Sequence, residues 1–286
     1  MEISSIFTIT KKDEVRDLAI GCFDGLHLAH FELFKHLGKK SAILIIDKDY
    51  KYNLTPNEDK HFFINFSVFS LSFDDIKHMQ GDEFLNELKK EFKNLEKIVL
   101  GYDFRFGLNR AFAADDVEKL SGIKTVIVPE FKLNGLSVHS KLIREFLKNG
   151  KIKEANEMLG RAYSVKAEIV RGQGLGSKEL VATINLECKD RYLLPKNGVY
   201  ASFTNLNDKF FKSVCFIGIR NTDLNFSFET HILDENFKDE NFKEARVFFK
   251  DFLRENQKFK DLSQLKAQIL KDCKNALKLL GGFNER

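Results

Sequence analysis

Short apolar runs alternate with helical patterns over the first half of the chain. The apolar runs read as buried strands, and the segments between them carry apolar residues three or four positions apart, on one face of a helix. This alternation is typical of a mostly parallel sheet covered by helices. The predicted strands are Leu18–Gly21, Ala42–Ile46, Ile98–Gly101 and Thr125–Val128, and the predicted helices are Phe31–Leu37, Asp82–Phe92 and Ser140–Leu147.

The pattern changes after Leu159 and Gly160 to an alternation of apolar and polar residues with a period of two. Gly, Asn and Asp turns separate these segments, which predicts antiparallel strands of a small barrel. A last segment, from Leu262 to Leu280, again has spacings of three and four and predicts a terminal helix packed across the barrel. The expected strands include Tyr163–Val170, Val199–Phe203, Val214–Ile217 and Phe226–Leu233.

The fold expected is therefore α/β plus β, a Rossmann-like layer with a parallel sheet followed by a small antiparallel β-barrel with a terminal helix. A length of 286 residues agrees with two domains, and 43% hydrophobic with 31% charged residues is typical of a globular protein. The net charge of +4 includes no long run of like charges, so nucleic acid is not an expected partner.

The N-terminus lacks the features of a signal peptide, and no apolar run is long enough to span a bilayer. We therefore expect a cytoplasmic protein without a membrane partner. The four cysteines, Cys22, Cys188, Cys215 and Cys273, include no Cys-x-x-Cys pair, so they indicate neither a zinc knuckle nor a disulfide framework.

The segment Gly21-Cys-Phe-Asp-Gly-Leu-His-Leu-Ala-His30 carries the strongest chemical signal. A strand ends at Gly21, Gly25 makes a turn, and His27 and His30 lie three apart on one face where a helix begins. A helix N-terminus attracts phosphate, and imidazole donors stabilise charge on a transferring phosphoryl oxygen. Such histidines are often solvated or packed in a core, but Phe-Asp-Gly directly after a strand favours a functional pair.

This segment resembles the Gly-x-Phe-Asp-Gly-x-His-x-Gly-His signature of the bacterial bifunctional riboflavin kinase/FAD synthetases. The resemblance implies that residues 1–158 are an FMN adenylyltransferase domain that converts FMN and ATP to FAD and pyrophosphate. Ala29 and Cys22 replace the family's Gly and Asn, and we expect the change at Ala29 to be mild if that position is helical. The implied catalytic residues are His27 and His30, and the implied nucleotide-binding residues are Gly21, Phe23, Asp24 and Gly25.

Two later segments support the resemblance. Gly101-Tyr-Asp-Phe-Arg-Phe-Gly107 is similar to the family's Gly-x-Asp-Phe-x-Phe-Gly turn, which implies a flavin and nucleotide pocket. Ser140-Lys-Leu-Ile-Arg144 resembles the Ser-Ser-Thr-x-Ile-Arg phosphate clamp, although His139 and Lys141 depart from it. The alternative interpretation of the first segment is a β-turn packed by its aromatic residues, and that of the second is an N-cap serine. The implied pocket residues are Asp103, Phe104, Phe106 and Gly107, and the implied phosphate ligands are Ser140 and Arg144.

The segment Arg171-Gly-Gln-Gly-Leu-Gly176 has no helix behind it, so it is not a dinucleotide fingerprint. With the segments that follow, it resembles the riboflavin kinase half of the same family, at residues 159–286. That resemblance implies a loop of Gly172, Gly174 and Gly176 over ATP, Mg²⁺ and phosphate held by Thr183 and Asn185, and a catalytic Glu229 that activates the ribityl hydroxyl.

The kinase motifs depart further from their pattern, because the stretch from Gly176 to Asn185 lacks the family's Arg, second Gly and Pro. A chain that only adenylylates FMN, with an inactive or flavin-binding barrel, is therefore the main alternative. Two others are a related transferase acting on a pantetheine or nicotinate nucleotide, and a non-catalytic flavin- or RNA-binding module. The first of these does not explain Thr183, Asn185 and Glu229, and the retained His27 and His30 argue against the second.

Overall fold

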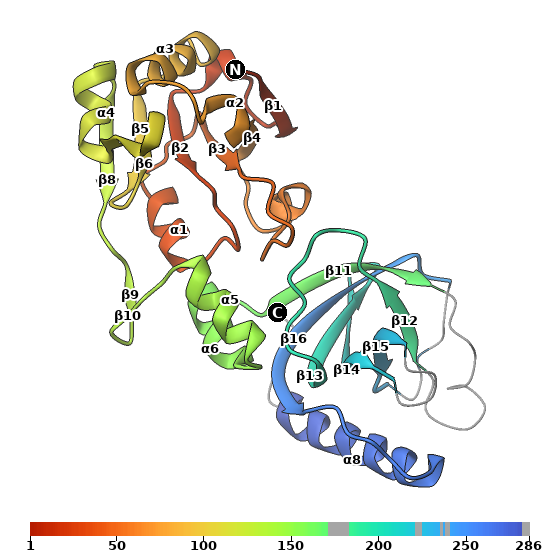
Figure 1. Cartoon of the computed structure of the whole chain (residues 1–286). Helices are drawn as coiled ribbons and strands as arrows, with labels where there is room; N and C mark the ends of the chain where they lie inside the picture. Colours follow the sequence, from red (N-terminus) through yellow and green to blue (C-terminus); the bar gives the residue numbers. More distant parts are fainter. Residues whose placement is uncertain (171–182, 221–224, 235–236, 238–240, 282–286) are drawn as a thin grey trace. The chain divides into compact units, whose positions relative to one another are not determined.

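The computed structural model describes residues 1–170, 183–220, 225–234, 237 and 241–281. The chain divides into two compact units, Met1–Ser140 and Lys141–Arg286 (Figure 1). The domain boundary expected at 158/159 lies further along the chain and stays a prediction. Across the residues described, no helix is both long and apolar enough to cross a membrane.

The first unit contains a sheet of strand order β1-β4-β3-β2-β5-β8. The predicted strands are confirmed as β2 (Asp17–Gly21), β3 (Ser41–Asp47), β5 (Lys97–Gly101) and β8 (Lys124–Val128), all parallel to their neighbours. β4 (Ser67–Ser72) extends the parallel part, and β1 (Ile3–Phe7) pairs with it antiparallel at the edge.

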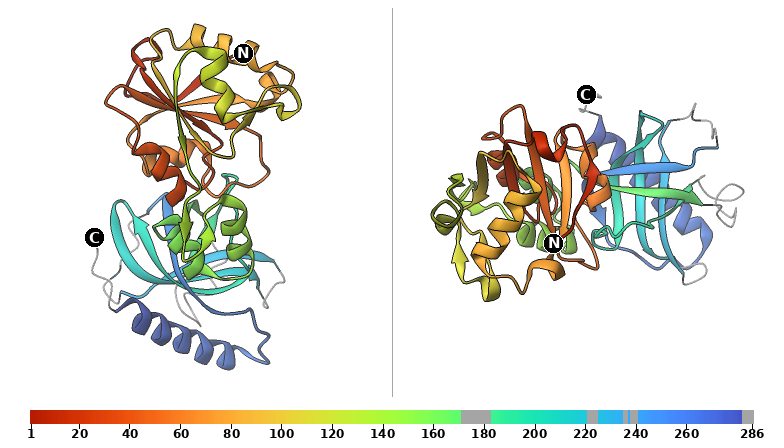
Figure 2. Two further views of the ribbon diagram at one scale, coloured as in Figure 1. Left: turned by 90° about the vertical axis from the view of Figure 1, so that its left-hand side faces the viewer. Right: turned by 90° about the horizontal axis from the view of Figure 1, so that it is seen from above.

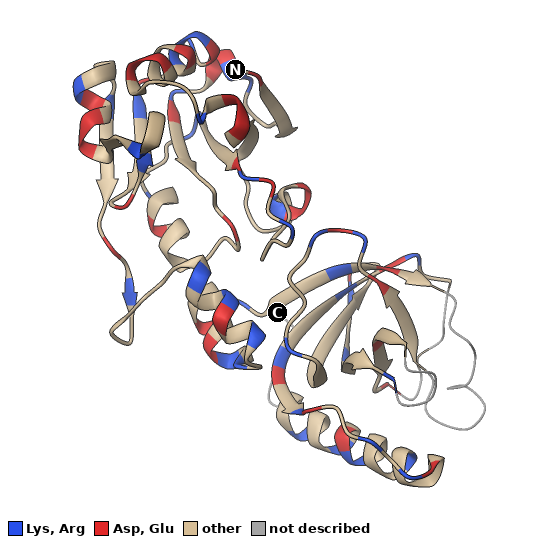
Figure 3. Ribbon diagram, in the orientation of Figure 1, with Lys and Arg blue, Asp and Glu red and all other residues tan. Residues whose placement is uncertain are grey.

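Helices pack on both faces of this sheet because the side chains of each strand alternate between two cores. Leu18 and Ile20 of β2 belong to one core with α3 (Gly81–Glu91) and α4 (Ala114–Ser121). Ala19 belongs to the other core, with α1 (Leu28–Phe34). Along the central strands β2, β3 and β5, charged residues occur only at the ends (Figure 3). A fully covered parallel sheet explains these nearly uninterrupted apolar runs.

Short elements complete the first unit. They are α2 (Phe73–Ile76), the two-stranded pairs β6 (Arg105–Phe106) with β7 (Phe112–Ala113) and β9 (Lys132–Leu133) with β10 (Leu136–Ser137), and the 3-10 helices Lys12–Glu14, Asn57–Phe62 and Leu108–Arg110. α5 (Ser140–Lys148) and α6 (Ile152–Leu159) follow along the chain.

The second unit is a closed antiparallel barrel, as predicted, of order β11-β12-β15-β14-β13-β16. α8 (Leu262–Leu280) lies along its outside (Figures 1 and 2), and Ala276 and Leu280 pack against strand side chains such as Val199 and Phe203. The strands are β11 (Tyr163–Val170), β12 (Ile184–Glu187), β13 (Gly198–Leu206), β14 (Lys209–Ile219), β15 (Phe226–Ile232) and β16 (Glu244–Arg254).

Candidate functional site

The turn between β2 and α1 has an unusual backbone. Gly25 has a φ of +85°, as its role in the predicted turn requires, and Phe23 and Leu26 also have positive φ values of 46°. A side chain at Gly25 would in addition lie 2.8 Å from Leu54 Cδ1. Each left-handed non-glycine residue costs about 1 kcal/mol or more, so the surrounding structure has to hold this turn.

The two predicted histidines come together at the end of this turn. His27 is the N-cap of α1 and His30 lies in its first turn, with the imidazole centroids 3.6 Å apart and the planes 18° from parallel. His27 is buried, with 4% of its surface exposed. Phe23 is buried and packs against the His30 ring in a T-shaped contact at 5.1 Å, so its side chain supports that imidazole. Ala29 lies in α1, so the condition under which we expect replacement of the family's glycine by alanine to be mild is met.

Asp24 holds the turn to neighbouring segments. Its Oδ1 accepts hydrogen bonds from the backbone N–H groups of Leu54 at 2.7 Å and Thr55 at 3.4 Å. Its backbone carbonyl accepts a hydrogen bond from the Ser140 hydroxyl at 2.8 Å. Two predicted nucleotide-binding segments, 116 residues apart in sequence, are therefore joined directly.

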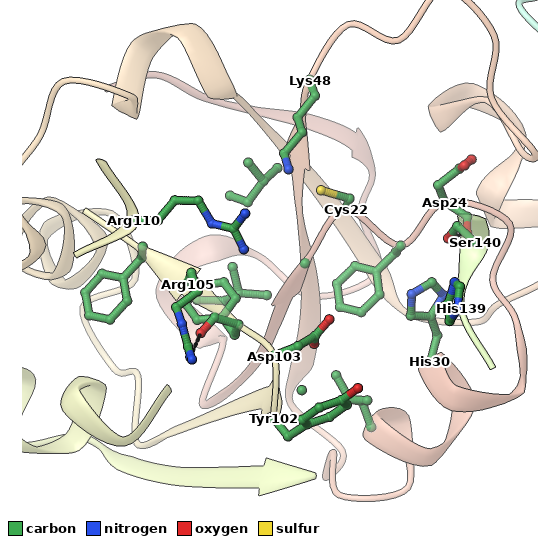
Figure 4. A pocket seen from close by; sticks show the side chains of 18 of the residues that line it. Cys22, Asp24, His30, Lys48, Tyr102, Asp103, Arg105, Arg110, His139 and Ser140 are labelled. Atoms are coloured by element: carbon green, nitrogen blue, oxygen red, sulfur yellow. Dashed lines mark hydrogen bonds between the residues drawn. The ribbon is translucent and has the colours of Figure 1, made fainter. Parts of the chain in front are cut away.

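A cavity of about 680 Å³ opens in front of the histidines, at the carboxyl ends of β2, β3 and β5. Ligands of open α/β sheets bind at such a strand edge. The histidine end contains His27, His30, Asp24 and Ser140, and Figure 4 shows Lys48, Cys22 and Arg110 toward the other end. The volume is large enough for a nucleotide-sized ligand.

The predicted pocket turn lines the same cavity. Asp103, Phe104, Phe106 and Gly107 all belong to its wall. Gly107 has a φ of +74°, and a side chain there would lie 2.7 Å from Phe112 and 3.1 Å from the Gly81 nitrogen. Phe106 is buried and packs against Phe112 and Phe104, so this ring shapes the wall from behind.

The cations of this cavity were not among the predicted site residues. Lys48, Arg105 and Arg110 line it together with His139. Arg110 has a φ of +59° and follows Asn109 at +56°, so a strained turn presents this side chain. No ion pair of Arg110 occurs within the described ranges, and its side chain points into the cavity (Figure 4). An unpaired arginine on a pocket wall is suited to an anionic ligand.

Cys22, at the end of β2, lies beside Lys48 on the same wall. Burial raises the pKa of this thiol above 9.0, against the lowering effect of the Lys48 ammonium group. Cys22 is therefore a neutral thiol near pH 7 and not an activated nucleophile. This agrees with a transfer reaction that needs no covalent enzyme intermediate.

Arg144 belongs to the second unit and lies one helical turn after Ser140 in α5. The positions i and i+4 share one face of a helix, so the two clamp residues project from the same side of α5.

The second predicted site lies on adjacent strands of the barrel. Asn185 of β12 and Glu229 of β15 are cross-strand partners, and Thr183 directly precedes β12. The Glu229 carboxylate accepts hydrogen bonds through Oε1 from Ser227 and, at 3.2 Å, from Arg220. The glycines predicted to close over ATP, Gly172, Gly174 and Gly176, lie outside the described residues.

The donor set of this second site suits a hard cation. Hydroxyl and amide oxygens are ligands that Mg²⁺ accepts when phosphate oxygens and water complete its octahedron. The described residues contain no cluster of three His, Cys, Asp or Glu side chains that could hold a metal ion by themselves. Thr183 and Asn185 therefore fit a metal that arrives with phosphate better than a resident ion.

Comparisons with known proteins cover both halves of the chain. The sequence model of the riboflavin kinase family (Flavokinase) matches residues 159–280. The bifunctional riboflavin kinase/FMN adenylyltransferase of Listeria monocytogenes is 29% identical, over 89% of this chain and 89% of that protein. The protein of the same name from Bacillus subtilis is 25% identical over 97% of this chain and 96% of that protein.

A solved structure has the same fold. The crystal structure described as a macrolide-efflux protein from Streptococcus pneumoniae superposes with a TM-score of 0.80, over 97% of this chain and 96% of that one. The sequences are 22% identical, so this likeness concerns the fold alone.

Proposed function

We propose that this chain belongs to the family of bifunctional riboflavin kinase/FMN adenylyltransferases and makes FAD from riboflavin in two ATP-dependent steps. The barrel phosphorylates riboflavin to FMN, and the first unit adenylylates FMN to FAD and releases pyrophosphate. Riboflavin, FMN and FAD are the substrates and products of these steps, and ATP is the co-substrate of both.

Adenylyl transfer takes place at the histidine end of the cavity. A phosphate oxygen of FMN attacks the α-phosphorus of ATP, and the bond from that phosphorus to the bridging oxygen of pyrophosphate breaks. His27 and His30 donate hydrogen bonds to the phosphoryl oxygens, whose charge increases as the reaction proceeds. Ser140 and Arg144 bind the ATP phosphates, and the Gly101–Gly107 turn forms part of the flavin and nucleotide pocket.

Riboflavin phosphorylation takes place at the barrel site. Glu229 accepts the proton of the ribityl hydroxyl, whose oxygen attacks the γ-phosphorus of ATP while the bond to ADP breaks. Arg220 and Ser227 orient the carboxylate. Thr183 and Asn185 would hold Mg²⁺, which would neutralise phosphate charge when bound.

The observation that supports the adenylyl transfer best is the stacked His27–His30 pair at the start of α1, facing a cavity of about 680 Å³. The test is to follow riboflavin, FMN and FAD by chromatography in one reaction with the purified protein and Mg-ATP. We expect FMN to appear first and FAD afterwards. If supplied FMN yields neither FAD nor pyrophosphate, the adenylyltransferase assignment is wrong.

The alternative of an inactive barrel is less well supported. The riboflavin kinase family model matches the barrel sequence, and Asn185 and Glu229 are adjacent despite the eroded motif around them. Glu229→Gln tests this half, and we expect FMN formation to fall about 100-fold or more because the base is lost. Glu187→Gln is the matched control, since Glu187 is an exposed carboxylate of β12, the strand that pairs with β15.

A further inference from the structure

Lys60 is the most deeply buried charged residue in the described part of the chain, with 1% of its surface exposed. It lies in the 3-10 helix Asn57–Phe62, next to the turn that carries His27. Removing an ammonium group from water is costly unless charges and hydrogen bonds compensate it. A lysine at this position therefore needs a specific set of partners.

The first partners of Lys60 lead to one wall of the cavity. Its Nζ donates hydrogen bonds to the Asn57 Oδ1 at 2.6 Å and the Thr55 carbonyl at 3.0 Å. The Asn57 amide in turn donates to Asp47 Oδ2 at 2.8 Å. Asp47 ends β3, and the next residue is Lys48 of the cavity wall. Lys60 is thus linked to the residue that precedes Lys48.

The same segment is held from the other side by the histidine turn. Asp24 binds the backbone N–H groups of Leu54 and Thr55, while Lys60 binds the Thr55 carbonyl. Asp24 is 5% exposed, so its carboxylate is also largely removed from water. Lys60 and Asp24 therefore bind the same Thr55 segment, and Lys60 is linked through Asn57 to Asp47, so its positive charge attracts both carboxylates.

We propose that Lys60 is a positioning residue for adenylyl transfer, whose positive charge fixes the Asp24 turn and the Asp47–Lys48 wall around the substrates. Lys60 contacts neither substrate in this proposal and acts through Asp24 and Asp47. The proposal rests on the proposed adenylyltransferase function.

The charge of Lys60 can be removed experimentally. Burial lowers its pKa from 10.5 to about 8, while the facing carboxylates Asp24, Asp47 and Glu58 and the Cys22 thiol act in the opposite direction. The protonated fraction of Lys60, and with it the active fraction, therefore falls above about pH 8. Cys22 does not account for such a change, because burial raises its pKa above 9.0.

Unfolding linked to the deprotonation of Lys60 does not account for a loss of activity above about pH 8 either. The unfolded chain keeps this proton up to about pH 10.5, whereas the folded chain loses it near pH 8. The unfolded state therefore binds more protons between these values, and the contribution of Lys60 to stability rises with pH there. A loss of activity in this range reports on the charge at the site.

The experiment measures the kcat of the full chain for FAD formation from FMN and ATP between pH 6.5 and 9.5. We expect kcat to fall about tenfold per pH unit above about pH 8. The conversion of riboflavin to FMN by the same protein is the internal control, and should lack this midpoint. A profile for FAD formation that is flat to pH 9.5 overturns the proposal, whereas no FAD formation at pH 7 overturns the adenylyltransferase function itself.

Two variants identify the titrating group. Lys60→Arg keeps its charge at every pH tested, so the fall should move above pH 9.5. Lys60→Met at pH 7 should show the low kcat of the wild type at high pH, without a further fall. Lys90→Met, at an exposed lysine of α3, is the control and should match the wild type. An unchanged midpoint in Lys60→Arg contradicts the proposal, and if either variant fails to fold, the wild-type profile decides.

Discussion

His30 is the residue at which the proposed adenylyl transfer can be removed with the least structural damage. It is half-buried, whereas its partner His27 is buried and caps α1. We expect His30→Ala to lower the kcat of FAD formation about 100-fold, which is typical for the loss of one donor to a transition-state oxygen. FMN formation from riboflavin should be unchanged.

His36→Ala is the matched control for this variant. His36 follows the same helix and is exposed, outside the residues that line the cavity. Equal losses of FAD formation in the two variants, or a loss of FMN formation in His30→Ala, would contradict the assignment of His30 to adenylyl transfer.

Arg110 offers a second test at the scale of single residues. Its guanidinium is on the cavity wall without an ion-pair partner among the residues described, and its backbone is strained. We expect Arg110→Ala to raise the KM for FMN or ATP about tenfold, because a charge-assisted hydrogen bond to an anionic substrate is lost. Arg16→Ala, whose exposed side chain pairs with Glu96, should leave both KM values unchanged.

These residues also mark the limit of prediction from sequence. The signature from Gly21 to His30 is local, so its turn and helix could be predicted from one short segment. The partners of the Asp24 carboxylate, Leu54 and Thr55, lie 30 and 31 residues further along the chain, and no short motif brings these segments together. Arg110 depends on a left-handed turn at Asn109 and Arg110. Asparagine adopts this conformation more readily than most residues, but arginine rarely does, so this pair of residues does not predict the turn.

At the scale of elements, α8 is anchored to the barrel by a buried ion pair. Arg254, at the end of β16, donates to Asp272 through Nε at 2.9 Å and Nη2 at 2.7 Å, and Gln268 donates to the same carboxylate. We expect Asp272→Ala to lower the free energy of unfolding of the barrel by about 3 kcal/mol, because it leaves Arg254, whose side chain is 15% exposed, without its counter-charge.

Chemical denaturation monitored by circular dichroism measures this effect, with Lys266→Ala on the exposed side of α8 as the control. The kcat of FAD formation should not change, since Asp272 is not among the residues that line the cavity. A loss of stability below about 1 kcal/mol would place this pair among those that contribute little.

Sequence patterns predicted best those helices and strands whose buried residues follow a regular spacing. β2, β3, β5 and β8 are apolar runs in a covered sheet, and their positions were predicted to within one residue. β16 has no simple alternation, because Phe248 and Phe249 are adjacent and its pairing with β13 contains register shifts. β1 was not predicted because its residues Ser4 and Ser5 are exposed at the sheet edge.

At the scale of the whole molecule, the proposed catalytic groups are divided between the two units. His27, His30 and every residue lining the cavity belong to Met1–Ser140, whereas Asn185 and Glu229 belong to Lys141–Arg286. A chain with a damaged kinase site therefore keeps the histidine site, and a chain with a damaged histidine site keeps the kinase site. FMN is the compound that connects the two steps.

This division predicts that two inactive chains complement each other. Glu229→Gln alone should make FAD from FMN but not from riboflavin, and His30→Ala alone should accumulate FMN. We expect an equimolar mixture to convert riboflavin to FAD after a lag, because FMN released by one chain has to reach the concentration at which the other binds it. Chromatography of all three flavins over time measures the lag, which added FMN should abolish.

The outcome also distinguishes release of FMN from direct transfer within one chain. If His30→Ala forms no more than one FMN per chain and the mixture forms no FAD, FMN does not leave the chain that makes it. A separate riboflavin-phosphorylating enzyme, added in excess, serves as the control, because it supplies free FMN to Glu229→Gln. Recovery of FAD formation only with that enzyme would contradict release from His30→Ala and would indicate that the intact chain retains FMN between its two sites.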